Sequence, residues 1–311
     1  MTDNLLEGRT SWPDIDVAAW APTKRTFHLC AQMLGKLRVA LSPVQPNWMF
    51  TALLLSARGI TTGTIPWRET SLQASLDIFS SEIIVELSDG NSERIPISPE
   101  RTVADIYTRL QTALKKLRVE CTISPIPQEI TDITPLPQDR RPAVYDPDAV
   151  LRWFQAATAT AGIFERWRTH FFGRTGIQVW WGALDVALLL FNGKHAAAPS
   201  DRGFIMKYDL DAQMMNAGLF YGDETTPPFF YGYIFPQPAG AEKLAIGPSA
   251  ASWSEPLKEW LLPYDDVRHA ADPSAQLHAF LDSIYGHCIQ AAGWDRDGLS
   301  YIAPKMRAPK T

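Results

Sequence analysis

Residues 173–190 read GRTGIQVWWGALDVALLL, and the fold prediction starts from this stretch. Gly173 ends a long amphipathic pattern, and an alternating run then leads into the apolar string 187–190. A similar order occurs earlier in the chain, where Gly35-Lys36 leads to the apolar string 52–55. We interpret the two stretches as one helix–glycine–strand unit that occurs twice, the alternative being a chance coincidence of common strings.

Helices are predicted on both sides of these stretches. One runs from Thr23 to a stop at Gly35, and another starts after Thr102, a favourable N-cap with an acid three residues later. In the second half, Asp146-Pro147 and Asp272-Pro273 each place an N-cap carboxylate before a proline at the first helical position. These signals predict long helices to about residue 172 and to Gly293.

The remaining pattern predicts antiparallel strands. In the first half we expect strands at 36–44, 48–58 and 118–123, and a hairpin or meander formed by 71–79 and 82–87 with a turn at 88–91. In the second half we expect strands near 177–191, 213–221 and 229–235, with a loop at 195–212.

The predicted fold class is therefore α+β, with two similar halves, each an antiparallel sheet with flanking helices. The halves would span 18–123 and 147–299, after a lead-in at 1–17 and before a tail at 300–311. Five prolines punctuate residues 124–146, so this segment is predicted to be a linker or an extended strap.

Composition excludes several classes of function. The chain has 311 residues, 46% hydrophobic and 20% charged, which is typical of a globular protein. Its net charge is −5 and it has no long basic cluster, so we expect no nucleic-acid partner. We expect no membrane association, because the N-terminus is polar and the apolar runs are too short to span a bilayer.

The cysteine spacing and the absence of standard motifs argue against several kinds of metal, cofactor and hydrolase site. Cys30, Cys121 and Cys288 are isolated and lack zinc-site spacing, which favours free thiols in a reducing, cytoplasmic compartment. The phosphate-binding, dinucleotide-binding, zincin and α/β-hydrolase motifs are absent. We therefore predict no metal site and no cofactor.

Several strings together resemble an uncharacterised bacterial family, domain-of-unknown-function family 5996. They are Thr26-Phe27-His28-Leu29 with Gly35-Lys36, Ala57 to Thr62 with Ile65-Pro66, Trp181-Gly182 with Asp185, Leu261 to Tyr264, and Gly293-Trp294-Asp295. The resemblance covers roughly residues 11–299 and implies a full-length bacterial protein, but no activity. The family pattern has His where this chain has Gln178 and Arg where it has Leu190, so no role is carried over to those positions.

Two groups of residues in the first half are candidates for binding or catalysis. His28 and Gln32 lie one helical turn apart on the first predicted helix, with Lys24 a turn earlier and Lys36 just past the helix end, so these side chains could bind or orient a polar ligand. The alternative is an ordinary polar helix flank. Arg58, with Thr61 and Thr62, could clamp an anion, or the arginine could simply cap a strand end.

Asp185 and the aromatic residues are the candidates of the second half. Asp185 interrupts an apolar strand and could act in acid–base catalysis. Alternatively, it could form a structural ion pair with Lys36, Arg174 or Arg58, or lie on a solvent-facing side of the strand. Trp181 and Tyr231 could line a ligand pocket, although such rings also fill cores.

The sequence thus favours a small-molecule binder or enzyme with an anionic ligand in a cleft between the halves. His28 and Asp185 would be catalytic, and Lys36, Arg58 and Arg174 would hold the ligand. The alternative is a non-catalytic interaction or scaffold protein that uses the aromatic-rich second half. A homodimer is compatible with both hypotheses.

Overall fold

The computed structural model describes residues 12–198 and 208–302. These residues form two compact units. The first comprises the described residues within Met1–Thr160, together with Gln178–Ala187 and Leu219–Phe229. The second comprises Ala161–Ile177 and the described parts of Leu188–Gly218 and Phe230–Thr311.

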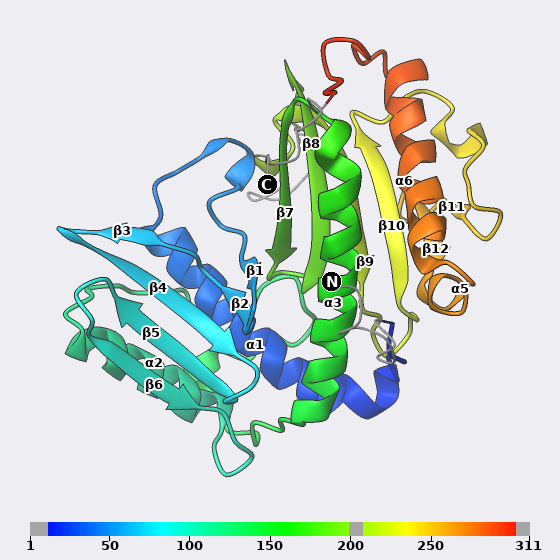
Figure 1. The fold of residues 1–311 in the computed structure, drawn as a ribbon. Coiled ribbons are helices and arrows are strands. Elements are labelled where there is room, and N and C mark those ends of the chain that lie inside the picture. Colours follow the sequence, from blue (N-terminus) through cyan, green and yellow to red (C-terminus); the bar gives the residue numbers. More distant parts are fainter. Residues whose placement is uncertain (1–11, 199–207, 303–311) are drawn as a thin grey trace, which may run out of the picture. The chain divides into compact units, whose positions relative to one another are not determined.

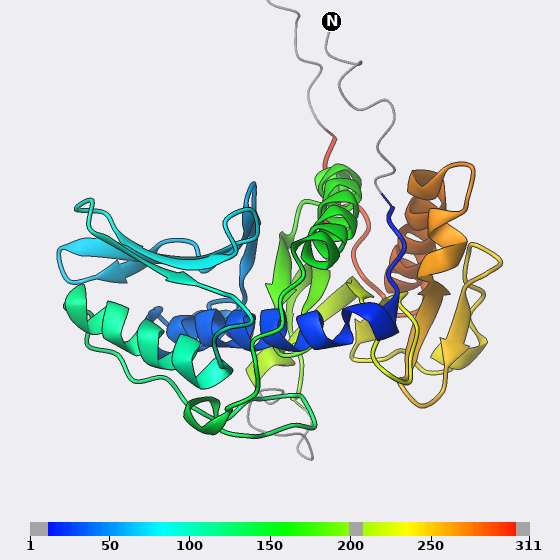
Figure 2. The same cartoon turned by 90° about the horizontal axis from the view of Figure 1, so that it is seen from below.

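The first unit is built on an antiparallel sheet with the strand order β1-β2-β4-β5-β6, and β3 pairs with β4. The strands are β1 (Leu54–Ser56), β2 (Gly59–Thr61), β3 (Ile65–Trp67), β4 (Thr70–Asp77), β5 (Glu82–Leu87) and β6 (Ser92–Pro96). Helices α1 (Val17–Leu41) and α2 (Val103–Lys116) cover one face of this sheet (Figure 2).

The covered face explains the alternation in β4. Leu72, Ala74 and Leu76 are fully buried, whereas Gln73 and Ser75, between them, keep part of their surface exposed. Period-two alternation of this kind packs one face of a strand against the core. The predicted hairpin of β4 and β5 and the turn that follows it are confirmed, but only 54–56 of the predicted strand 48–58 form β1.

Helix α2 begins as its sequence predicts. The Thr102 hydroxyl accepts a hydrogen bond from the Asp105 N–H at 3.2 Å, and the Asp105 carboxylate accepts one from the Thr102 N–H at 2.9 Å. This reciprocal capping box satisfies two backbone donors that the first turn leaves without helical partners.

Helix α1 is longer than its sequence predicts. It starts at the N-cap Asp16, continues through Gly35 and ends at Leu41, so the predicted strand at 36–44 is wrong. Glycine is a common helix stop, but here it has a packing role. The indole of Trp181 lies where a side chain at position 35 would be, so Gly35 lets the ring approach the helix backbone.

The strap, residues 124–146, contains no strand and packs onto the first unit. Its backbone binds α2 and the residue before its cap, with Ala104 N–H donating to the Asp139 carbonyl and Ala143 N–H donating to that of Arg101. Two residues of the strap itself, Leu136 and Ala143, are fully buried. The preceding residues 118–123 form no strand, so the predicted strand there is wrong.

The second sheet has the strand order β11-β12-β10-β9-β8-β7. Its strands are β7 (Arg174–Trp180), β8 (Asp185–His195), β9 (Ala212–Phe220), β10 (Phe229–Phe235), β11 (Ser252–Ser254) and β12 (Glu259–Pro263) (Figure 1). The predicted strands are thereby confirmed. The predicted loop at 195–212 contains residues 199–207, which lie outside the described residues.

The remaining helices are α3 (Pro147–Trp167), α5 (Tyr264–Arg268) and α6 (Pro273–Gln290). Both Asp-Pro starts are confirmed, and the Asp272 carboxylate accepts a hydrogen bond from Ala275 N–H at 2.9 Å. The apolar stripe of α6 is buried as predicted, with Leu277, Leu281, Ile284 and Cys288 all at 0% exposure.

The fold class is therefore α+β, with two antiparallel sheets and flanking helices. This two-sheet layout is compatible with two similar halves, and the internal duplication stays a hypothesis. Within the described ranges, no helix combines the length and apolar character that crossing a membrane requires.

Because Gly35 packs against Trp181, we expect its replacement by alanine to destabilise the protein, unlike most Gly→Ala substitutions in helices. Gly→Ala inside a helix normally stabilises by up to about 1 kcal/mol. We expect Gly35→Ala to lower the free energy of unfolding by about 1–3 kcal/mol, because the new methyl overlaps the Trp181 ring. Urea denaturation measures the change.

Gly162→Ala in α3 is the matched control. Its methyl would meet only Arg166 Nη1 at 3.5 Å, an ordinary contact with a flexible side chain, so this variant should be more stable than the wild type. Stabilisation by both substitutions would contradict the proposed packing of Trp181 on α1.

Candidate functional site

The candidate site lies on one face of α1, in the first unit. Lys24, His28, Gln32 and Lys36 follow at intervals of four residues and therefore share this face; we call them the α1 polar strip. His28, Gln32 and Lys36 are buried, and Lys24 is half-buried. A buried polar row of this kind needs partners, since an unsatisfied buried polar group is costly.

The strap supplies many of these partners through its backbone. The Gln32 side-chain amide donates to the Gln128 carbonyl at 2.7 Å, and its oxygen accepts from the Gln128 N–H at 2.9 Å. Lys36 Nζ donates to the Ile126 carbonyl at 2.7 Å. Because no strand pairs with this part of the strap, these side chains satisfy backbone groups that would otherwise lack protein partners.

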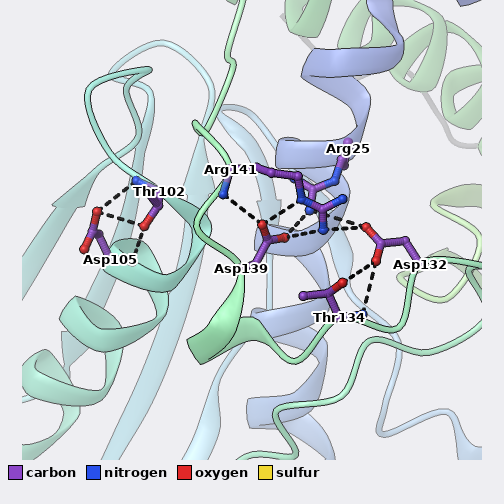
Figure 3. A network of polar contacts seen from close by, with 7 residues as sticks. All are labelled: Arg25, Thr102, Asp105, Asp132, Thr134, Asp139 and Arg141. Carbon is purple, nitrogen blue, oxygen red and sulfur yellow. Dashed lines mark hydrogen bonds and ion pairs between the residues drawn. The ribbon is translucent and has the colours of Figure 1, made fainter.

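A charged network fixes the strap further along α1 (Figure 3). Arg25 and Arg141 both bind the Asp139 carboxylate, whose side chain is only 1% exposed. Arg141 also forms an ion pair with Asp132 at 2.6 Å, and the Thr134 hydroxyl donates a hydrogen bond of 2.7 Å to the Asp132 carboxylate. These contacts join α1 to both ends of the segment 132–141.

The network also explains the acidity of its carboxyl groups. Burial alone would raise the pKa of Asp139, but the hydrogen bonds from Arg141 and Arg25 outweigh it and lower the pKa. The pKa of Asp132 is lowered to about 2, chiefly by the Thr134 hydroxyl, with Arg141 contributing. Both carboxylates therefore stay charged at neutral pH.

The turn that connects β7 and β8, residues 181–184, is the second wall of the site. Leu53 and Val179 exchange two backbone hydrogen bonds of 2.8 and 2.9 Å, which anchor the end of β7. Trp181 Nε1 then donates to the Thr51 carbonyl at 2.9 Å. The ring of Trp181 is thus held against α1 by both a hydrogen bond and the space at Gly35.

His28 binds this turn directly. Its Nε2 lies 2.8 Å from the Trp181 carbonyl oxygen, which can only accept, so Nε2 carries the hydrogen of the neutral ring and Nδ1 carries the lone pair. Burial lowers the pKa of His28 to about 4, although hydrogen bonds to the Trp181 and Gly182 backbone oppose this shift. His28 is therefore neutral at physiological pH.

Lys36 is the most unusual residue of the strip. The residue is 3% exposed, and its ammonium lies over the Trp181 ring at 5.5 Å from the centroid. Among the described residues its one hydrogen-bond acceptor is the Ile126 carbonyl, and no carboxylate forms an ion pair with it. Burial lowers the pKa of Lys36 to about 8.

Glu129, on the strap, contributes a carboxylate that sequence reasoning missed. Its backbone has φ 57°, a left-handed conformation uncommon for residues other than glycine. Its carboxylate lies against Gly182, where any Cβ would overlap it. Although the residue as a whole is exposed, neighbouring atoms crowd the carboxyl group and raise its pKa through desolvation.

The structure brings together only part of the predicted site. His28, Lys36 and Trp181 meet as described above. Asp185 is buried at the start of β8, three residues beyond Gly182 in the chain. Its predicted catalytic role stays a prediction, as does that of His28.

The predicted anion clamp of the first half has other partners. Arg58 forms an ion pair with Asp77 and lies over the Phe79 ring at 5.3 Å. Thr61 donates to the Ala74 carbonyl at 3.2 Å, and Thr62 accepts from the Ala74 N–H at 2.9 Å. These contacts have structural roles within the first sheet.

Arg174 and Tyr231 belong to the second unit. Arg174 stacks on the Phe191 ring at 4.1 Å, and burial lowers the pKa of its guanidinium while Asp211 opposes the shift. The Tyr231 side chain fills the space beside Gly218. Burial raises the pKa of Cys288, so this thiol is protonated at neutral pH and is a poor nucleophile.

The buried His28 predicts acid sensitivity. Its pKa is about 4 in the folded state and about 6.5 when unfolded, so the unfolded chain takes up the proton first. The contribution of neutral His28 to the free energy of unfolding is therefore complete above pH 6.5. It is lost as the pH falls towards 4, by on the order of 3 kcal/mol. We expect His28→Gln to flatten the pH dependence of unfolding in this window.

Chemical denaturation at a series of pH values tests this prediction, with His269→Gln, at an exposed histidine, as the control. An unchanged slope in His28→Gln would show that protonation of His28 does not govern acid stability.

The charged network predicts a difference between its two carboxylates. Asp139→Asn should lower the free energy of unfolding by about 2–3 kcal/mol, because it leaves two arginines without their buried counter-charge. The same change at Asp132, which is 38% exposed, should cost about 1 kcal/mol or less. Equal losses in urea denaturation would contradict the assignment of Asp139 as the centre of the network.

Comparison with known proteins adds a family but no activity. No curated protein and no solved structure matches this chain. The model of one family, described as a family of unknown function, matches residues 12–301. With nearly its whole length matched, the chain belongs to the family of unknown function DUF5996.

Proposed function

We propose that this protein binds a small anionic molecule at the α1 polar strip, with Lys36 as the charged anchor and the Trp181 ring beside it. The observation that supports this proposal most is the buried ammonium without a carboxylate partner among the described residues. Taking a charge out of water costs several kcal/mol unless an opposite charge or several hydrogen bonds compensate.

Holding the strap does not by itself account for Lys36. Gln32 satisfies one N–H and one carbonyl of the strap with a neutral side chain. Lys36 satisfies one carbonyl with a cation that has three N–H donors, so two donors remain for other acceptors. A neutral amide could bind the same carbonyl at lower desolvation cost, which favours a role for the positive charge itself.

An anion would supply what Lys36 lacks. A carboxylate or phosphate oxygen accepts charge-assisted hydrogen bonds from an ammonium, and these are stronger than bonds to a neutral carbonyl. His28 would hold the adjacent turn in place through Nε2 and leave Nδ1 as an acceptor. Catalytic roles for His28 and Asp185 are a further part of the hypothesis, since a bound substrate must come first.

We also infer a cytoplasmic location. Cys30 and Cys288 are buried free thiols and Cys121 is free as well, which favours a reducing compartment.

Acetate is the probe that tests the anion site. We expect isothermal titration calorimetry at constant ionic strength to detect binding of acetate in the millimolar range, weakened at least about tenfold in Lys36→Met. The affinity should also fall as pH rises through about 8, because Lys36 then loses its proton.

Lys116→Met is the matched control. Lys116 is a 60% exposed lysine of the same unit that pairs with Glu93, so its loss should leave acetate binding unchanged. Circular dichroism checks that both variants fold. Absence of acetate binding to the wild type, or equal binding to Lys36→Met, would sink the proposal.

A further inference from the structure

The turn at Trp181 and Gly182 has a second charge beside it, of opposite sign to Lys36. The Glu129 carboxylate lies against Gly182, and the Lys36 ammonium lies over the ring of Trp181. Within the described chain Glu129 forms no ion pair and no side-chain hydrogen bond. Two unlike charges thus lie beside adjacent residues without pairing with each other or with other charged groups.

Two local features hold the Glu129 carboxylate in this place. The backbone of Glu129 adopts φ 57°, which costs a non-glycine residue about 1 kcal/mol. Gly182 leaves the space that the carboxylate fills, and any larger residue would displace it. A strained residue whose carboxylate has no protein partner indicates a role other than stability.

We propose that the site binds a small zwitterion such as a free α-amino acid, whose carboxylate contacts Lys36 and whose ammonium contacts Glu129. This inference rests on the anion-binding function proposed above and names its ligand class. A zwitterion neutralises both charges, whereas a simple anion would leave Glu129 without a partner and close to a second negative charge.

The hydrogen-bonding capacity of the two residues agrees with this ligand class. Lys36 has two N–H donors beyond the one that binds Ile126, enough for the two oxygens of a carboxylate. The Glu129 carboxylate has acceptors for the N–H donors of an ammonium. Glu129 is exposed and Lys36 is buried, so the ligand's carboxylate would be its deeper group.

Glu129 would therefore determine which carboxylate ligands the site prefers. Its charge favours ligands that carry a cation next to the carboxylate, and it disfavours simple monocarboxylates and dicarboxylates. The Trp181 ring would pack against the carbon atoms between the two charged groups, while its attraction for the ammonium helps to keep Lys36 charged.

Three small probes separate the two contacts: glycine, acetate and methylammonium. Each is titrated into the wild-type protein by calorimetry at constant pH and ionic strength. We expect glycine to bind at least about tenfold more tightly than acetate or methylammonium. The variant Glu129→Gln, which keeps the shape of the side chain, should bind glycine and acetate equally, with acetate at its wild-type affinity or slightly tighter.

Two further variants complete the test. Lys36→Met should lose glycine and acetate binding together, while Glu86→Gln, at an exposed glutamate of the first sheet, should behave as the wild type. Gly182→Ala should reduce the preference for glycine without loss of acetate binding, because the new methyl displaces the Glu129 carboxylate.

The outcomes distinguish the two proposals. Equal affinity of the wild type for glycine and acetate, or an undiminished preference for glycine in Glu129→Gln, would overturn the zwitterion proposal and leave the anion site intact. Absence of binding for all three probes would overturn both.

Discussion

The packing of the Trp181 ring on the bare backbone of Gly35 is the constraint on which the arrangement of the site depends. It brings the turn at residues 181–184 against α1, and this contact places the Trp181 carbonyl within reach of His28. The same contact sets the ring below the Lys36 ammonium and leaves Gly182 facing the strap. A side chain at position 35 would separate all of these groups at once.

The strap depends on α1 in a different way. It has five prolines and no strand neighbour, so some of its N–H and C=O groups take their partners from side chains. Gln32 provides a donor and an acceptor in one amide, and Arg25 fixes the segment near Asp139 through charge. Gln32 and Arg25 are polar residues on a packed helix, and they are present because the strap has no sheet to join.

The sequence predicts those elements whose signals are local. The capping box at Thr102, the Asp-Pro helix starts and the alternation in β4 depend on residues within one turn or one strand, and all are confirmed. The predicted helix end at Gly35 is wrong because glycine can either end a helix or allow close packing against it. The contact that distinguishes the two roles comes from Trp181, which is distant in the sequence. The candidate site could be predicted in part, since His28, Lys36 and Trp181 are polar or aromatic residues in apolar surroundings.

Glu129 could not be found in this way, since it lies in an aperiodic, proline-rich segment where a glutamate is unremarkable. The one signal was Gly182, a glycine directly after two tryptophans where a strand ends, which indicates close approach by another group.

The distinction between structure and function in this unit follows from charge balance. Asp139 and Arg25 are opposite charges that meet, and their pairing is sufficient reason for both to be buried or half-buried. Lys36 and Glu129 are opposite charges beside the same turn that do not meet, and one of them is kept there by a strained backbone. Direct pairing would be the more stable arrangement if stability were the sole requirement, because it would compensate the desolvation of both groups. The proposed zwitterionic ligand would supply both complementary charges and so compensate the desolvation that the protein leaves uncompensated.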